Sequence, residues 1–239
     1  SRRYLKNLAL PPLVVVDTNI LVDALVDKIA HNLELASETS LDLFEHDNFH
    51  KVLKSRADAG RINLWLPSIV KHELTELSKR HGKLKAKFSS SLVKPEVLES
   101  VLDDSKISKL VDEIISEYSR WRPLNIHTER DAMDEQSDQE ISHFLSEFYE
   151  IYDELTDMKL TRDPKQNRTE INGKAIFPEP ADREIMAICR NLAAQSLEGL
   201  GSILVATRDG DFTLTARAFE ERFGYGIIKN SKMLNSWLN

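Results

Sequence analysis

Hydrophobic residues in this chain form short runs that stop abruptly at polar residues. Residues 13–16 are an uninterrupted, valine-rich run, and the polar residues Asp-Thr-Asn follow at once. Residues 203–207 repeat the pattern near the other end of the chain. Runs of this length and composition predict strands buried on both faces, as in a parallel sheet. Residues 62–66 predict a further strand, and residues 226–228 a short edge strand.

Between these strands the apolar residues recur every three or four positions, which is the spacing of one helix face. The pattern predicts helices over residues 20–29, 41–60, 68–82, 181–194, 214–223 and 232–238. Gly60 is expected to end the second of these helices, and Ser231 to cap the last. Strands that alternate with helices favour an α/β fold with a central parallel sheet.

Histidine and cysteine can bind metals or take part in redox chemistry, but in this sequence a structural role is favoured for both. His46 and His50 are four residues apart on one predicted helix, but no third ligand is near, so a solvated polar face is favoured over a metal site. The single Cys189 cannot form an internal disulfide, and it lies in an apolar helical pattern. We expect it to be a small core residue.

Residues 83–176 depart from the alternation of strand and helix. Pro95 begins a helical stretch, and helical stripes cover residues 107–118 and 141–155. Residues 163–168 and 172–173 have the Asp, Asn, Pro and Gly content of loops. We therefore expect a single domain over residues 1–239 with a mostly helical insertion at 83–176.

The composition is typical of a globular protein, since 41% of the 239 residues are hydrophobic and 30% are charged. No run approaches the ~18 apolar residues of a membrane span, so no membrane partner and a cytoplasmic location are expected. The net charge of −7 is unevenly distributed: residues 127–157 contain eleven acids and one arginine, which leaves +3 on the rest of the chain. This acidic segment is interpreted as a solvated helix face, with docking of a basic protein or a second copy as the alternative.

Five basic residues with no acid among them follow the helix over 68–82. They are Lys79, Arg80, Lys83, Lys85 and Lys87. Such a cluster is either the solvated end of a helix or a guide for the backbone of an RNA strand. The overall acidity of the chain therefore does not exclude a nucleic acid as substrate.

Four carboxylates fall at positions that a parallel sheet could bring to one edge. Asp17 and Asp209 each end a buried strand, and Glu73 and Asp182 lie in early turns of helices that begin near the same edge. Open α/β sheets bind ligands at this edge. Carboxylates placed together repel one another, so such a cluster needs a cation or raised pKa values. Oxygen ligands without Cys or His select hard cations, here Mg²⁺ or Mn²⁺.

Each acid also has a structural explanation when it is taken alone. Asp17 or Asn19 could simply cap the helix that follows. Glu73 could lie on an exposed helix face, and Asp182 could be favoured in its first helical turn by the helix dipole alone. The shared site is favoured because all four acids occur where one sheet edge would gather them. Divalent ions in carboxylate sites activate water and hold the oxygens of a phosphodiester.

Four segments of the chain, taken in order, resemble the PIN-domain nucleases. They are Val15-Val16-Asp17-Thr18-Asn19, Pro67-Ser68-Ile69-Val70-Lys71-His72-Glu73-Leu74, Asp182-Arg183-Glu184-Ile185-Met186-Ala187 and Val205-Ala206-Thr207-Arg208-Asp209-Gly210-Asp211-Phe212. The resemblance covers residues 13–82 and 176–239. It implies a three-layer α/β/α fold, a divalent-metal site and cleavage of single-stranded RNA.

The resemblance also implies a role for individual residues. The acids that would bind the metal and carry the reaction are Asp17, Glu73, Asp182 and Asp209. Thr207 would orient the site, and Asn19 would brace Asp17. Asp211 is a further candidate, because members of the family differ over which aspartate of this turn faces the ion. The insertion distinguishes this chain from the small bacterial PIN toxins and favours a larger PIN protein.

The function expected first is a metal-dependent endoribonuclease in which activated water attacks the phosphodiester. A catalytically silent PIN scaffold that binds RNA or protein is the main alternative, although a scaffold has no need for acids that repel one another. A phosphatase of the haloacid-dehalogenase type needs a second aspartate two residues after the first, where this chain has Asn19. P-loop nucleotide hydrolysis is unsupported, since no Gly-x4-Gly-Lys occurs.

Overall fold

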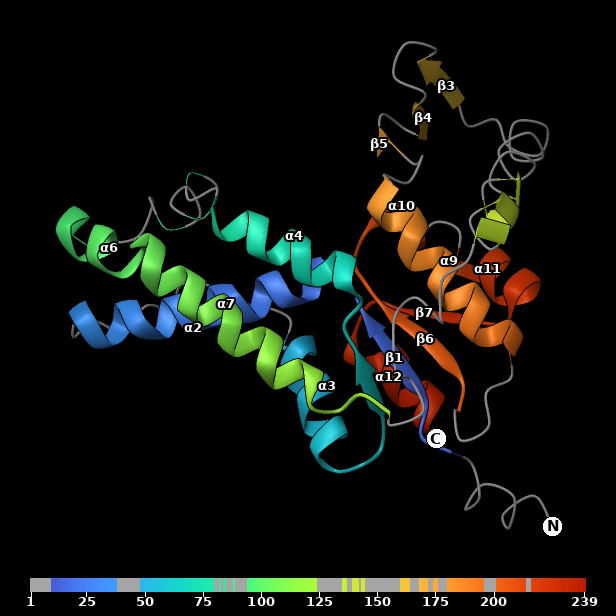
Figure 1. The fold of residues 1–239 in the computed structure, drawn as a ribbon, viewed down its shortest axis with the longest axis horizontal. Helices are drawn as coiled ribbons and strands as arrows, with labels where there is room; N and C mark the ends of the chain where they lie inside the picture. Colours follow the sequence, from blue (N-terminus) through green and yellow to red (C-terminus); the bar gives the residue numbers. More distant parts are fainter. Residues whose placement is uncertain are drawn as a thin grey trace.

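The structure of the chain is a computed structural model, shown in Figure 1. It describes residues 10–37, 48–79, 82, 84, 88, 94–123, 135–136, 139–141, 143–144, 160–163, 168–171, 174–175, 180–195, 201–213 and 216–239.

A four-stranded parallel sheet forms the centre of the fold. Its strands are β1 (Leu13–Val16), β2 (Asn63–Trp65), β6 (Ile203–Ala206) and β7 (Gly226–Ile228), in the order β2-β1-β6-β7. Every pair in this sheet is parallel. The four residues of β1 are fully buried, as the uninterrupted apolar run predicts for a central strand covered on both faces. All four predicted strands are confirmed, and β7 lies at an edge as expected.

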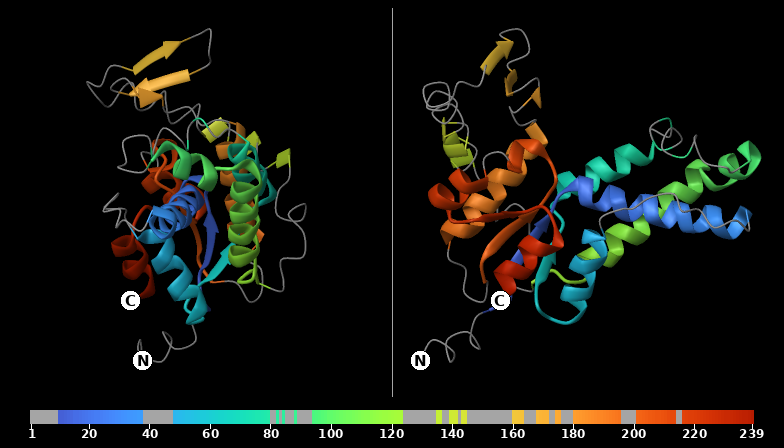
Figure 2. Two further views of the ribbon diagram at one scale, coloured as in Figure 1. Left: turned by 90° about the vertical axis from the view of Figure 1, so that its left-hand side faces the viewer. Right: turned by 180° about the vertical axis from the view of Figure 1, so that it is seen from behind.

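Helices cover both faces of this sheet, which gives three layers, α/β/α. The helices that follow the first two strands are α2 (Thr18–Ser37), α3 (Phe49–Asp58) and α4 (Ser68–Ser78). Those of the C-terminal part are α9 (Pro180–Gln195), α10 (Gly210–Thr213), α11 (Ala216–Phe223) and α12 (Ser231–Leu238). In the left view of Figure 2 the sheet lies between α4 on one side and α3 with α12 on the other. The predicted α/β fold class is confirmed.

The first part of the predicted insertion is helical and packs on the main domain. It contains α6 (Pro95–Val101) and α7 (Asp104–Ser119), and both helices contact α2. α2 is longer than the predicted 20–29, since α6 and α7 give its second half a surface on which to bury Ile29 and Leu33. Figure 1 shows α2, α6 and α7 projecting together from the sheet.

The later part of the insertion contains strands that the sequence pattern does not predict. β3 (Leu160–Asp163), β4 (Arg168–Ile171) and β5 (Lys174–Ala175) form a separate antiparallel sheet in that order. Residues 163 and 168, predicted within a loop, are paired ends of β3 and β4. Of the helix predicted over 141–155, residues 141 and 143–144 are helical and the others lie outside the described residues.

Several local predictions are tested by the packing. Gly60 has a φ of 65° just after α3, which confirms it as the residue that ends the helix. Asn230, and not Ser231, caps α12, because its side chain accepts a hydrogen bond from the backbone N–H of Met233. Cys189 is fully buried in the core, as predicted.

The prediction of a solvated face was wrong for His50, which is only 4% exposed. Its Nε2 lies 3.1 Å from Asp27 Oδ2 on α2, and its backbone carbonyl accepts a hydrogen bond from the Tyr118 hydroxyl on α7. Packing of α3 between two other helices therefore buries the residue. His46 lies outside the described residues.

Candidate acidic site at the carboxyl edge of the sheet

Asp17 lies at the junction between the central strand β1 and helix α2. Its backbone N–H donates to Ala206 O at 3.0 Å, which continues the pairing of β1 with β6. Its carbonyl accepts from Ile20 N–H at 3.2 Å, which begins the first turn of α2. The residue is therefore held by a strand and a helix at once, and only 4% of its surface is exposed.

Three donors hold the carboxylate of Asp17. The backbone N–H of Thr18 donates to Oδ1 at 2.6 Å, and the Asn19 amide donates to Oδ2 at 2.5 Å. The Thr207 hydroxyl, from the end of β6, donates to the same Oδ2 at 2.6 Å. A helix cap normally accepts from the second or third N–H of its helix, whereas Asp17 accepts from the first. Capping alone therefore does not explain this arrangement.

Burial raises the pKa of Asp17 to about 6, because the ionised form loses its hydration. Hydrogen bonds from Thr207 and Thr18 act in the opposite direction, and the neighbouring acids Asp209 and Glu73 raise the pKa further. No lysine or arginine among the described residues forms an ion pair with Asp17 or Glu73. The ionised form of Asp17 is therefore disfavoured, and a bound cation would stabilise it.

Thr207 links the two strand ends through its hydroxyl. Its backbone N–H donates to Ile228 O at 3.0 Å, which fixes it beside β7. Besides donating to Asp17, its Oγ1 accepts from the Asn19 amide at 3.1 Å and from the backbone N–H of Asp209 at 3.0 Å. Thr207 is fully buried, so these partners satisfy a hydroxyl that water does not reach.

Glu73 joins the site through Thr18, which the sequence interpretation did not include among the site residues. The Thr18 hydroxyl donates to Glu73 Oε2 at 2.5 Å, and this bond connects the first residue of α2 with the middle of α4. Glu73 is half-buried rather than on an exposed helix face. The sequence offered one signal for Thr18. It lies between Asp17 and Asn19 at the start of a helix, and the first side chains of such a helix lie near the same edge of the sheet.

The remaining predicted acids, Asp182 and Asp211, belong to α9 and α10. Asp182 lies half-buried in the first turn of α9, a helix that contacts both α4 and β6. In the described part of the chain, no three His, Cys, Asp or Glu side chains lie close enough together to hold a metal ion. Asp211 belongs to α10, and its side chain lies outside the described residues. The structure therefore links Asp17 with Glu73 and Asp209, and for Asp182 it gives the position on α9.

The predicted basic cluster is described at one residue. Lys79 follows α4, is exposed and forms an ion pair with Glu76 at 2.6 Å. Arg80, Lys83, Lys85 and Lys87 lie outside the described residues.

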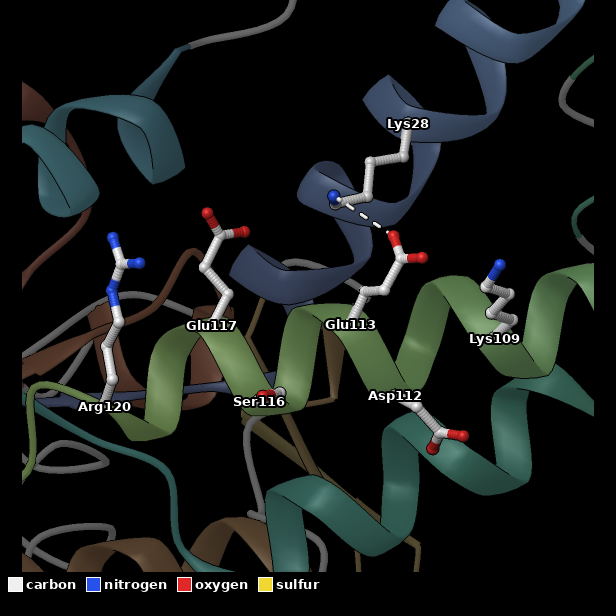
Figure 3. A pocket seen from close by; sticks show the side chains of 7 residues that line it. All are labelled: Lys28, Lys109, Asp112, Glu113, Ser116, Glu117 and Arg120. Carbon is white, nitrogen blue, oxygen red and sulfur yellow. Dashed lines mark ion pairs between the residues drawn. The ribbon is translucent and has the colours of Figure 1, made fainter.

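A groove of about 550 Å³ lies along α7 and α2 (Figure 3), and Asp17 is not among the residues that line it. Its charged lining is made up of Lys28, Lys109, Arg120, Asp112, Glu113 and Glu117. Three bases and three acids leave no net charge, and Lys28 pairs with Glu113 at 3.7 Å. This lining has no preference for an anionic strand, so the acidic site remains the stronger candidate.

In comparisons with known proteins, no family model, no curated protein and no solved structure matches the chain. Among the described helices, none combines the length and the apolar character needed to cross a membrane.

Proposed function

We propose that this protein is a divalent-metal-dependent endoribonuclease that cleaves single-stranded RNA at the acidic site. The observation that carries the proposal is the buried carboxylate of Asp17, which three neutral donors hold at the carboxyl end of the central strand. Two further acids raise its pKa, and the described residues supply no basic partner for it. Burial and acidic neighbours disfavour the ionised form of Asp17, whereas a cation-dependent reaction requires a carboxylate there. A cytoplasmic location is part of the proposal.

The chemistry of the donors fits Mg²⁺ or Mn²⁺, because carboxylate and amide oxygens are the ligands that these ions prefer. Their spacing fits less well, since the described residues contain no compact group of three acids. We therefore infer that ion binding draws Glu73 and Asp209 toward Asp17, with Asp182 or Asp211 as a further ligand. Neutralising the repulsion between these acids would favour that movement.

When bound, the ion supplies a water molecule of lowered pKa and neutralises charge on the phosphodiester. The protein residues would hold the reacting groups in place. Asn19 and Thr207 fix the carboxylate of Asp17, and Thr18 orients Glu73. Water would attack the phosphorus and leave 5′-phosphate and 3′-hydroxyl ends. The basic cluster over residues 79–87 would guide the backbone of the RNA strand.

The test is cleavage of single-stranded RNA with Mn²⁺, with and without EDTA. We expect Asp17→Asn to lower the rate by about 100-fold or more, because removing one charged group from such a site has an effect of this size. Asp58→Asn is the matched control, since Asp58 is an exposed acid paired with Arg120 at 2.9 Å. Equal rates for wild type and Asp17→Asn would overturn the proposal.

A catalytically silent scaffold that binds RNA or protein is the second candidate. It is favoured by the spacing of the described acids, which form no compact group of three. Its partner could be a basic protein or a second copy that docks on the acidic segment over 127–157. RNA binding that is insensitive to EDTA and unaccompanied by cleavage would support this scaffold over the nuclease.

A further inference from the structure

Arg208 lies between two site residues, Thr207 and Asp209, in the loop that joins β6 to α10. Its guanidinium forms an ion pair at 2.6 Å with Asp23 Oδ2 on α2. Its backbone N–H donates to Asn19 Oδ1 on the same helix at 3.2 Å. Asn19 and Asp23 are four residues apart, so they lie on one face of α2. The loop is therefore attached to this face at two points.

The ion pair differs from the exposed pairs elsewhere on the molecule. Asp23 is only 9% exposed, so its charge has lost most of its hydration and depends on Arg208 for compensation. Because 33% of the Arg208 side chain is exposed, the pair is half-buried, and leaving Asp23 without its partner should destabilise the protein more than losing an exposed pair. The pair therefore holds the loop more firmly than a surface ion pair would.

The attachment matters because the loop carries the hydrogen bonds that hold Asp17. Asp209 N–H donates to Thr207 Oγ1, and Thr207 Oγ1 donates to Asp17 Oδ2. A shift of the loop would lengthen first the bond from Asp209 to Thr207 and then the bond from Thr207 to Asp17. Displacements of about 1 Å in such supporting groups can lower rates by up to about 100-fold.

We propose that Arg208 is a positioning residue, whose ion pair with Asp23 clamps the loop over 207–209 onto α2 and thereby holds Thr207 on Asp17. The effect on catalysis rests on the proposed nuclease function, while the clamp itself does not. We therefore expect loss of the clamp to act on the turnover step and not on the binding of RNA.

The test compares Arg208→Ala, Asp23→Asn/Arg208→Ala and Arg208→Lys with wild type. Arg217→Ala is the matched control, because Arg217 forms an exposed pair with Glu221 at 2.8 Å. For Arg208→Ala we expect the backbone amides of residues 208 and 209 to exchange about tenfold faster by NMR. We expect kcat for Mn²⁺-dependent RNA cleavage to fall about tenfold, with KM unchanged within about twofold. Arg208→Lys should recover part of both losses, since it keeps the charge that Asp23 needs.

The double variant separates positioning from stability. Asp23→Asn removes the uncompensated acid, so the double variant should unfold at a higher temperature than Arg208→Ala while kcat stays low. Recovery of kcat together with stability would show a merely structural role and overturn the proposal. A rise in KM with unchanged kcat would also overturn it, because Arg208 would then bind RNA directly.

The failure of the clamp and the failure of the proposed function give different results. If wild type does not cleave RNA, the nuclease proposal fails, and amide exchange still tests the clamp. Unchanged exchange in Arg208→Ala overturns the clamp whether or not wild type is active.

Discussion

Two charged clusters lie along the same helix, α2, and they are built differently. At the start of α2, the acidic site holds the carboxylate of Asp17 with neutral donors. About three turns later, Asp27 of α2 pairs with Lys51 of α3 at 2.8 Å, and beside it Lys54 of α3 pairs with Glu117 of α7; these residues form the ion-pair cluster. This second cluster lines a cavity of about 460 Å³ between α2, α3 and α7.

The difference indicates which cluster serves the fold. Acids that pair with lysine or histidine within the protein are compensated, so packing alone accounts for them. Asp17 is nearly as buried as the core around it, yet its neighbours include two further acids that raise its pKa. A perturbed charge of this kind is typical of functional sites, and a cation bound there, as proposed, would account for it. The following predictions test this contrast, from the largest expected effect to the smallest.

Substitutions that neutralise the other acids of the site should affect only activity. We expect Glu73→Gln and Asp209→Asn each to lower kcat/KM for Mn²⁺-dependent RNA cleavage by about 100-fold. Glu117→Gln, in the ion-pair cluster, should stay within about twofold of wild type. Initial rates on a labelled single-stranded RNA provide the measurement. If Glu117→Gln loses as much activity as the other two variants, the contrast between the acidic site and the ion-pair cluster is refuted.

Asp17 should limit stability in a pH-dependent way. Its folded-state pKa of about 6 is above the ordinary 3.8, so ionisation destabilises the fold and wild-type stability falls as pH rises from about 4 to 6. Asp17→Asn cannot ionise, so its stability relative to wild type should increase by up to about 3 kcal/mol between pH 4 and pH 8.

Denaturant unfolding in EDTA measures this difference, with Asp27→Asn as the control from the ion-pair cluster. Asp27 contacts His50 and Lys51, so its loss should lower stability at neutral pH, opposite in sign to the effect at Asp17. If the stability of Asp17→Asn relative to wild type does not change with pH, then burial does not disfavour the ionised form of Asp17.

Thr18 should matter through its hydroxyl. Thr18→Val keeps the shape of the side chain but removes the donor to Glu73 Oε2, so we expect kcat to fall about tenfold. Thr75→Val on α4 is the matched control, because its hydroxyl donates to the Lys71 carbonyl in its own helix. If both variants keep wild-type activity, Thr18 does not orient Glu73 for the reaction.

The sequence predicts the central sheet well and the second sheet not at all, for a physical reason. Strands such as β1 and β6 are buried on both faces, and this produces uninterrupted apolar runs that few other structures explain. β4 (Arg168–Ile171) contains arginine, threonine and glutamate beside a single isoleucine. Its pairing with β3 is specified by backbone hydrogen bonds, which leave little trace in hydrophobicity.

The candidate site divides in the same way. Asp17 and Asp209 could be predicted, because a strand end fixes where they lie. The contact of Thr18 with Glu73 and the pair between Asp23 and Arg208 could not, since both join segments more than fifty residues apart in the chain. Side-chain pairs of this kind follow from tertiary packing and have no periodicity.

His50 gives the smallest and most selective test of the ion-pair cluster. Burial lowers the pKa of His50 below its ordinary 6.5, while Asp27 raises it, Lys51 lowers it and Asp23 raises it. Because the folded-state pKa is lowered, the stabilising contribution is complete above pH 6.5 and is lost as pH falls below that value. The opposing carboxylates keep this effect smaller than that of Asp17.

We therefore expect wild type to lose stability between pH 7.5 and 5.5 more steeply than His50→Gln, which cannot be protonated in this range. Denaturant unfolding at the two pH values measures the difference, and His31→Gln is the control from the same cavity. Should His50→Gln and wild type respond alike, the neutral state of His50 would contribute nothing to the fold. The ion-pair cluster would then not weaken in acid, whereas the structure predicts that acid weakens this cluster and stabilises the site around Asp17.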